Sequence, residues 1–151
     1  MNLGVYTDVL GNTGDLLSAV KSINEGVENG ELEDASIFYD SASNDFPSVA
    51  INCGCFNSTD LWNFTGSLVT TGIDLTKNAL AMINKFDIIY YHGWKEDQKL
   101  NTISLIEIAT NPKVKVVCRD EDGCNNLKRL TGLQSKIVNE FNIKELLEVA
   151  K

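Results

Sequence analysis

The sequence predicts a three-layer α/β fold in which helices cover both faces of a mostly parallel sheet of five to seven strands. The first observation is that short apolar runs alternate with longer segments whose apolar residues recur at intervals of three and four. The second is the run Ile88-Ile89-Tyr90-Tyr91, which is apolar without alternation, as is typical of a strand covered on both faces. The third is size: 151 residues, 43% of them hydrophobic, fit one domain with a buried core.

Short apolar runs that stop at polar or glycine-containing loops are the candidate strands. In chain order they are residues 3–7, 35–39, 49–53, 67–71, 88–91, 114–118 and 136–138. Helical spacing predicts helices over residues 16–27, 75–86, 100–109, 125–131 and 143–150, with a short helical turn over 61–64. Thr13 or Asp15 would cap the first helix, Asp74 the second, and Gly132 ends the fourth.

Strands that alternate with helices at this spacing predict a Rossmann-like or flavodoxin-like domain over residues 1–151, with right-handed crossovers. An antiparallel hairpin within residues 49–71 is the alternative, because the connections there are short.

Charge is distributed unevenly along the chain. Residues 1–76 hold one basic residue, Lys21, and eleven acidic ones, a formal charge of −10, whereas residues 77–151 hold 12 basic and 10 acidic residues, a charge of +2. Nucleic-acid binding depends on Lys and Arg at phosphates, so we expect no nucleic-acid partner. The acidic half either keeps the protein soluble or attracts a protein partner with a basic surface.

No apolar run approaches the roughly 18–20 residues that a membrane span needs, and the N-terminus lacks a signal-peptide pattern. We therefore expect a cytoplasmic protein that does not bind membranes.

Four cysteines are either free thiols or, together, a four-thiolate metal site: Cys53, Cys55, Cys118 and Cys124. One residue separates the first pair and five separate the second, whereas zinc ligands are usually two to four residues apart. Disulfides are not expected in a reducing compartment. We expect free thiols, with no metal and no cofactor.

Ligands of parallel sheets bind at the carboxyl ends of the strands, near the point where the strand order reverses. The candidate ligand-binding residues at these ends and loops are Gly11, Asn12, Thr13, Gly14, Asp40, Asn57, Thr71, Trp94 and Arg119. The loop of residues 11–14 opens a helix, where a phosphate could bind. It lacks the G-x-G-x-x-G spacing and the lysine of a Walker loop, so a tight turn is the alternative.

His92, the single histidine, is the candidate general base, with Asp8 as the second catalytic candidate. A carboxylate such as Asp8 or Asp120 would orient the imidazole if their strands are adjacent. The alternative is a hydrogen-bonded surface histidine. Trp94 would either stack on a sugar or base or anchor its own loop. No G-x-S-x-G motif is present, which disfavours covalent hydrolase chemistry.

Residues 3–14, the segment Phe86-Asp87-Ile88-Ile89-Tyr90-Tyr91-His92-Gly93 and residues 114–132 resemble the N-terminal, acceptor-side half of two-domain GT-B glycosyltransferases. The resemblance implies a Rossmann-like fold with residues 11–14 and His92 on the acceptor side. Residues 5–14 are also similar to the start of short uncharacterised proteins of T4-like marine phages. In GT-B enzymes the C-terminal domain holds most of the sugar donor, and this chain ends where that domain would begin.

We therefore expect a binding module for a protein partner or a small ligand, as an accessory phage protein in the host cytoplasm or as a homodimer. The alternative is a small nucleotide- or sugar-handling enzyme with its site at the strand ends.

Overall fold

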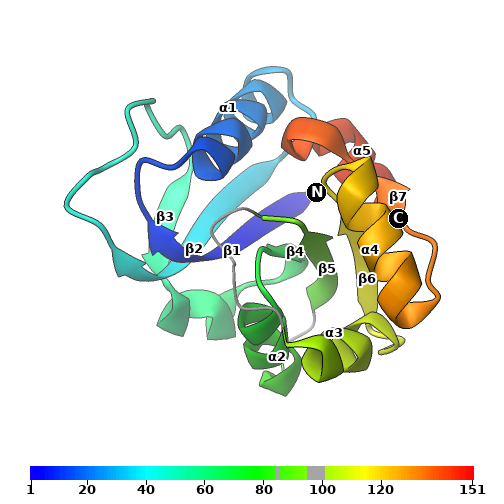
Figure 1. The fold of residues 1–151 in the computed structure, drawn as a ribbon. Helices are drawn as coiled ribbons and strands as arrows, with labels where there is room; N and C mark the ends of the chain where they lie inside the picture. Colours follow the sequence, from blue (N-terminus) through cyan, green and yellow to red (C-terminus); the bar gives the residue numbers. More distant parts are fainter. Residues whose placement is uncertain (84–85, 95–100) are drawn as a thin grey trace.

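The computed structural model describes residues 1–83, 86–94 and 101–151. Within these ranges seven parallel strands form one sheet in the order β3-β2-β1-β4-β5-β6-β7 (Figure 1). The strands are β1 (Asn2–Leu10), β2 (Asp34–Ala42), β3 (Gly54–Asn57), β4 (Gly66–Thr70), β5 (Phe86–His92), β6 (Val114–Cys118) and β7 (Lys136–Ile137). The predicted fold class is confirmed. The antiparallel hairpin is wrong, because β3 and β4 both pair in parallel with their neighbours.

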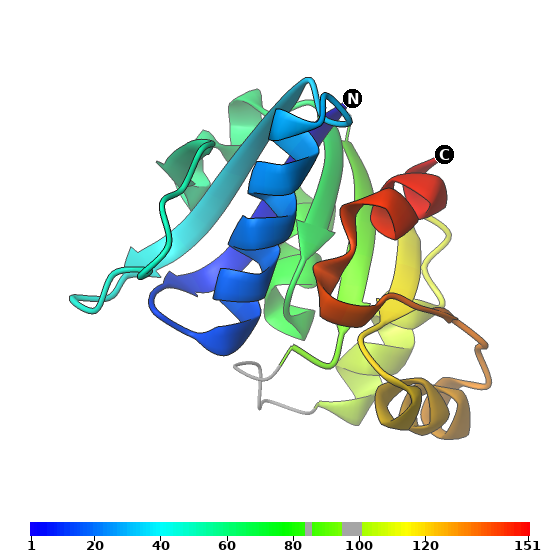
Figure 2. The ribbon, with the colours of Figure 1, turned by 90° about the horizontal axis from the view of Figure 1, so that it is seen from above.

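Helices cover the two faces of the sheet. The helices are α1 (Gly14–Glu28), α2 (Ile73–Ala81), α3 (Thr102–Ala109), α4 (Glu121–Thr131) and α5 (Ile143–Ala150), with the 3-10 helices η1 (Ser58–Asn63) and η2 (Asn139–Phe141). One hydrophobic cluster joins the sheet to α1 and α5, and a second joins it to η1, α2, α3 and α4. Figure 2 shows α1 and α5 on the same side of the sheet.

The central strands and α1 follow the sequence pattern closely. Leu16, Val20 and Ile23 form the buried stripe of α1 and are at most 1% exposed. The helix ends at Glu28, and Gly30 follows it with a φ of 70°. β6 has the bounds that the apolar run predicted, although Lys115 within it is exposed.

β3 differs from the prediction. Residues 49–53 are an irregular segment, and the strand begins only at Gly54. The segment passes along α1, where the amide of Asn24 donates to Ala50 O and accepts from Asn52 N. A side chain of α1 thus satisfies the backbone groups that a neighbouring strand would otherwise bind.

The bounds of three helices, α2, α3 and α4, also differ from the prediction. α2 begins at Ile73 with Gly72 as its N-cap, so Asp74 lies in the first turn and is not the cap; the helix ends at Ala81, and Phe86 belongs to β5. α4 begins four residues earlier than expected, because Asp120 Oδ1 accepts the Gly123 N–H and caps it. α3 begins at Thr102; residue 100, its predicted first residue, lies outside the described residues.

The strand order reverses between β1 and β4, because the chain moves outward from β1 to β3 and then crosses to β4. Residues at the carboxyl ends of these two strands therefore flank the position where doubly wound folds bind their ligands. None of the helices in the described ranges is long and apolar enough to cross a membrane.

Candidate functional site

A pocket of about 240 Å³ lies between the start of α1 and the ends of β5 and β6. We call it the edge pocket; its lining residues are Gly14, Asp15, Ser18, Tyr91, Trp94, Arg119, Glu140 and Phe141. Three of the predicted ligand-binding residues, Gly14, Trp94 and Arg119, come from separate segments and meet here. The edge pocket is therefore the candidate site that agrees with the expected position at the carboxyl edge.

A buried ion pair forms one wall of the edge pocket. Arg119 Nη1 lies 2.5 Å from Asp15 Oδ1, and the Asp15 side chain is 7% exposed. Asp15 is in the first turn of α1, where the free N–H groups of the helix also favour a carboxylate. Gly93 has a φ of 101°, and a Cβ there would lie 3.2 Å from Arg119 Cβ, so only glycine lets β5 end this close to Arg119.

Three aromatic rings form another wall. Tyr91, Trp94 and Phe141 contact one another with centroids 5.3 to 6.1 Å apart, and each is at most 5% exposed. The Tyr91 hydroxyl donates to Val138 O at 2.8 Å, and burial raises the pKa of this phenol to about 12. The tyrosine is therefore a neutral structural group. Trp94 packs on Tyr91 and Phe141, which agrees with the interpretation that it anchors its own loop.

The remaining residues of the 11–14 loop serve the fold. Gly11 is buried, Asn12 N donates to Asp45 O, and Asn12 Oδ1 accepts from Ser48 N. Thr13 is the N-cap of α1, although its side chain makes no capping hydrogen bond. These bonds tie the loop to the β2–β3 connection, which supports the tight-turn interpretation. The carboxylate of Asp15 and its guanidinium partner take the helix start where a phosphate would otherwise bind.

Three other candidates lie outside the edge pocket. Asp40 is part of β2 and accepts the Tyr6 hydroxyl at 2.8 Å. Burial and this carboxylate raise the pKa of Tyr6 to about 12. Asn57 caps η1 through Thr59 N, and Thr71 Oγ1 donates to Tyr6 O across the gap between β1 and β4. Each has a structural partner, so the predicted convergence of all the candidates at one edge does not occur.

The two catalytic candidates are not adjacent. β4 lies between β1 and β5, so the backbones of Asp8 and His92 are about 10 Å apart from strand spacing alone. Asp8 is exposed within β1, because this strand continues to Leu10. His92 is 7% exposed, and its Nδ1 lies 3.1 Å from the Tyr90 hydroxyl. Asp120 Oδ1 accepts from Gly123 N at the cap of α4.

The four cysteines form two pairs at different places in the sheet. Cys53 and Cys55 lie at the β3 edge, whereas Cys118 ends β6. Four strands separate β3 from β6, so a single four-thiolate site is wrong, and no cluster of three or more His, Cys, Asp or Glu in the described residues could hold a metal ion. The Cys53 thiol hydrogen-bonds to Cys55 and lowers the pKa of Cys55 to about 7. Burial raises the pKa of Cys118 to about 12.

No family model, curated protein or solved structure matches the chain, so the site is interpreted from its own residues. Asp15 was not predicted as a site residue, because its position at the start of a helix suits a cap. Glu140 and Phe141 were not predicted either; they reach the pocket through an unusual backbone in which both have a positive φ, 51° and 56°. No local sequence signal predicts that conformation for Glu or Phe.

Proposed function

We propose that this chain is a Rossmann-like binding module that holds a small, uncharged polar molecule, such as one sugar ring, in the edge pocket. The observation that supports the proposal is the meeting of Gly14, Trp94 and Arg119 around one pocket at the carboxyl edge of the sheet, between the start of α1 and the ends of β5 and β6. Of residues 11–14, which the resemblance to GT-B enzymes implies for the acceptor side, only Gly14 lines the edge pocket.

The size of the pocket limits the ligand. A volume of about 240 Å³ is smaller than the roughly 300–1,000 Å³ of pockets that hold drug-sized molecules. One ring with hydroxyl groups fits this limit better than a nucleotide sugar or a dinucleotide. The wall of aromatic rings would contact the apolar face of such a ring, and the polar side chains would bind its hydroxyls.

The charge of the pocket favours a neutral ligand. Asp15 and Glu140 are acidic, and Arg119 is the basic residue among those that line the pocket. Arg119 is already paired with Asp15, so a phosphate would have to compete with that carboxylate and would meet a second one. The ligand that we expect donates hydrogen bonds to carboxylate oxygens and carries no phosphate.

Tryptophan fluorescence tests the proposal directly. Trp94 lines the pocket, whereas Trp62, the other tryptophan, is 57% exposed on η1. In a Trp62→Phe variant, titration with neutral monosaccharides is expected to shift the remaining emission with a saturable curve. UDP, UDP-glucose and ATP are expected to leave it unchanged at the same concentrations.

Two variants locate the binding. Ser18→Leu adds bulk inside the pocket and is expected to abolish the fluorescence response, whereas Ser48→Leu on the exposed β2–β3 connection makes the same change outside it. Circular dichroism checks that both variants fold. No response to any sugar would overturn the proposal; a response to nucleotides alone would favour the small nucleotide-handling enzyme instead.

A protein partner with a basic surface is the second candidate, because the charge of residues 1–76 lies on the surface. Nine of their eleven acidic side chains are exposed; Asp15 is buried and Glu31 is intermediate. A surface of this kind speeds association with a basic partner in a salt-dependent way.

A lysine decapeptide tests this second candidate. A triple variant of exposed acids in the first half, Asp8, Asp45 and Asp74→Asn, is expected to lower its affinity at least fivefold more than a matched triple variant in the second half. The matched variant changes the exposed Asp87, Glu121 and Asp122 to Asn or Gln. Equal losses in the two variants would mean that only net charge matters, and would contradict a binding surface on the first half.

A further inference from the structure

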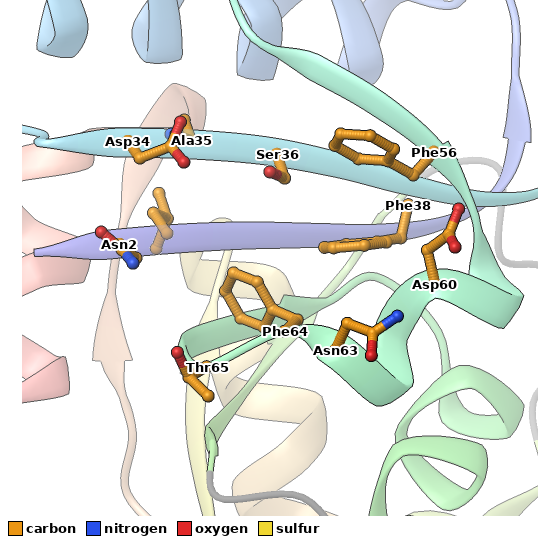
Figure 3. A pocket seen from close by; sticks show the side chains of 11 residues that line it. Asn2, Asp34, Ala35, Ser36, Phe38, Phe56, Asp60, Asn63, Phe64 and Thr65 are labelled. Carbon is orange, nitrogen blue, oxygen red and sulfur yellow. The ribbon is translucent and has the colours of Figure 1, made fainter.

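A second cavity lies on the other face of the sheet, between β1, β2, β3 and η1 (Figure 3). We call it the sheet-face cavity. Its volume is about 440 Å³, within the range of pockets that bind small molecules. It is formed at the amino-terminal half of these strands, so it is separate from the edge pocket and shares no residue with it.

The register of the sheet explains why this cavity exists. Gly4 of β1, Ser36 of β2 and Gly54 of β3 lie side by side in one row across three strands. No side chain in this row is larger than serine, so the rings of Phe64 and Phe56 can lie against Gly4 and Gly54, and Ser36 is the residue of the row that lines the cavity. The β3–β4 connection on this face contains only the six-residue η1.

Aromatic rings surround the cavity. The centroid of Phe38 is 6.0 Å from that of Phe56 and 5.3 Å from that of Phe64, and the three rings lie around one space in Figure 3. A Cβ on Gly4 would come within 2.9 Å of the Phe64 ring, so the glycine lets this ring lie against the sheet. Phe56 is 43% exposed although it is a large apolar residue. The cavity therefore presents ring surface to whatever enters it.

The charged groups of the cavity are all negative, and its other polar side chains, Asn2, Ser36, Asn63 and Thr65, are neutral. Asp34 and Asp60 line it, and none of its described lining residues is Lys, Arg or His. Asp60 comes from η1, and Figure 3 shows it at the same end of the cavity as Phe38 and Phe56. Asp34 lies at the other end of the cavity, at the start of β2. Ring faces and a carboxylate on one site both attract a cation.

We propose that the sheet-face cavity binds a small organic cation, an ammonium group on an extended hydrocarbon chain. The ammonium lies near the Asp60 carboxylate and the exposed ring of Phe56, while the hydrocarbon chain extends over Ser36 towards Asp34. The volume accommodates an apolar chain that would otherwise face water, and the negative lining rejects carboxylates and phosphates of the same shape. This site goes beyond the function proposed for the edge pocket, and each can fail without the other.

Three probes of equal length separate charge from hydrophobicity: hexylammonium, hexan-1-ol and hexanoate. The binding constant of each is measured from NMR shifts of the backbone amides of residues 34–38, 56 and 63–65. Hexylammonium is expected to bind about threefold to tenfold more tightly than hexan-1-ol, because only the ammonium gains from the rings and the carboxylate. Hexanoate is expected not to bind. Equal binding of the ammonium and the alcohol would overturn the proposal, and so would no binding of either.

Matched variants exclude general attraction to an acidic protein. Asp60→Asn is expected to weaken hexylammonium binding and so reduce its preference over hexan-1-ol, and to leave the binding of the alcohol unchanged. Asp74→Asn removes an equal charge from exposed α2, outside the cavity, and is expected to change neither. If both variants weaken hexylammonium equally, the attraction is nonspecific and the site is refuted. Ser36→Leu fills part of the sheet-face cavity and is expected to block binding of both the ammonium and the alcohol.

A further probe, 1,6-diaminohexane, carries an ammonium group at each end. It is expected to bind more tightly than hexylammonium, because its second ammonium group reaches Asp34.

Discussion

The two halves of the sheet are covered to different extents on the face that packs against η1 and α2. β4, β5 and β6 are covered there by α2, α3 and α4, which bury Leu105 and Leu127 completely. β1, β2 and β3 are covered by η1, and Phe56 and Trp62 stay 43% and 57% exposed. Both halves have the same parallel architecture, so the difference comes from the length of one connection. A short crossover leaves a sheet face open, and an open sheet face is available to a ligand.

The largest expected effect compares a core side chain from each half. Leu127→Ala in α4 is expected to lower the free energy of unfolding by about 2–5 kcal/mol, because the side chain is fully buried and its removal leaves a cavity. Phe56→Ala is expected to cost about 1 kcal/mol despite the larger side chain, because nearly half of it is already in water. Urea denaturation followed by circular dichroism measures both. A cost for Phe56→Ala as large as that for Leu127→Ala would show that this face is closed in solution.

The second comparison uses the thiols of the two halves. Cys55 in β3 has a pKa lowered to about 7 by the hydrogen bond from Cys53, so its thiolate fraction increases as the pH rises through 7. Alkylation by iodoacetamide is expected to be about tenfold faster at pH 8 than at pH 6. Cys118 has its pKa raised to about 12 by burial and is expected not to react in the folded protein.

Cys53→Ala is the control for this comparison, because it removes the thiol that donates a hydrogen bond to Cys55. The pH midpoint of Cys55 alkylation is expected to rise in this variant. Mass spectrometry of the alkylated peptides identifies which thiol has reacted. A midpoint that stays near 7 in the variant would contradict the role of Cys53.

The smallest expected effect concerns the helix starts. Asp120→Ala is expected to destabilise the protein by about 1 kcal/mol, because it removes the bond from Oδ1 to Gly123 N at the start of α4. Thr13→Ala at the start of α1 is expected to change stability by less, because the threonine side chain makes no capping hydrogen bond. Thermal unfolding of the two variants measures the difference; equal losses would show that Thr13 caps α1 in solution.

The sequence predicted the parts of the fold in which one local pattern decides the structure. The bounds of β6 follow from its apolar run, and the buried stripe of α1 follows from helical periodicity. β3 could not be predicted, because Gly54, Cys55 and Phe56 show no strand pattern and the apolar residues 49–51 before them are held by Asn24 of α1. A contact between distant residues decides that segment, and a single sequence does not reveal such contacts.

The candidate site was predicted only in part for the same reason. Residues at strand ends could be located, and Gly14, Trp94 and Arg119 do meet. The strand order decides which polar groups form hydrogen bonds with one another. Thr71 donates to Tyr6 O because β1 and β4 are neighbours, whereas His92 is not beside Asp8 because β4 lies between their strands. The sheet-face cavity depends on register, since Gly4, Ser36 and Gly54 form a row only when three strands align.

The central position of β1 also constrains the order in which the chain folds. β1 is synthesised before the other strands of this sheet, yet one of its two neighbours, β4, follows about sixty residues later, with Val5 paired to Val69. The β1–α1–β2 unit can assemble early from contacts that are close in sequence, but it has one unpaired central edge until β4 is made. Closing that edge requires a long loop, which slows folding relative to a helical protein of the same length. Until β4 pairs with β1, Leu3 and Val5, which are fully buried in the folded protein, can contact other unfolded chains. The tendency of this protein to aggregate should therefore depend on how quickly β4 pairs with β1.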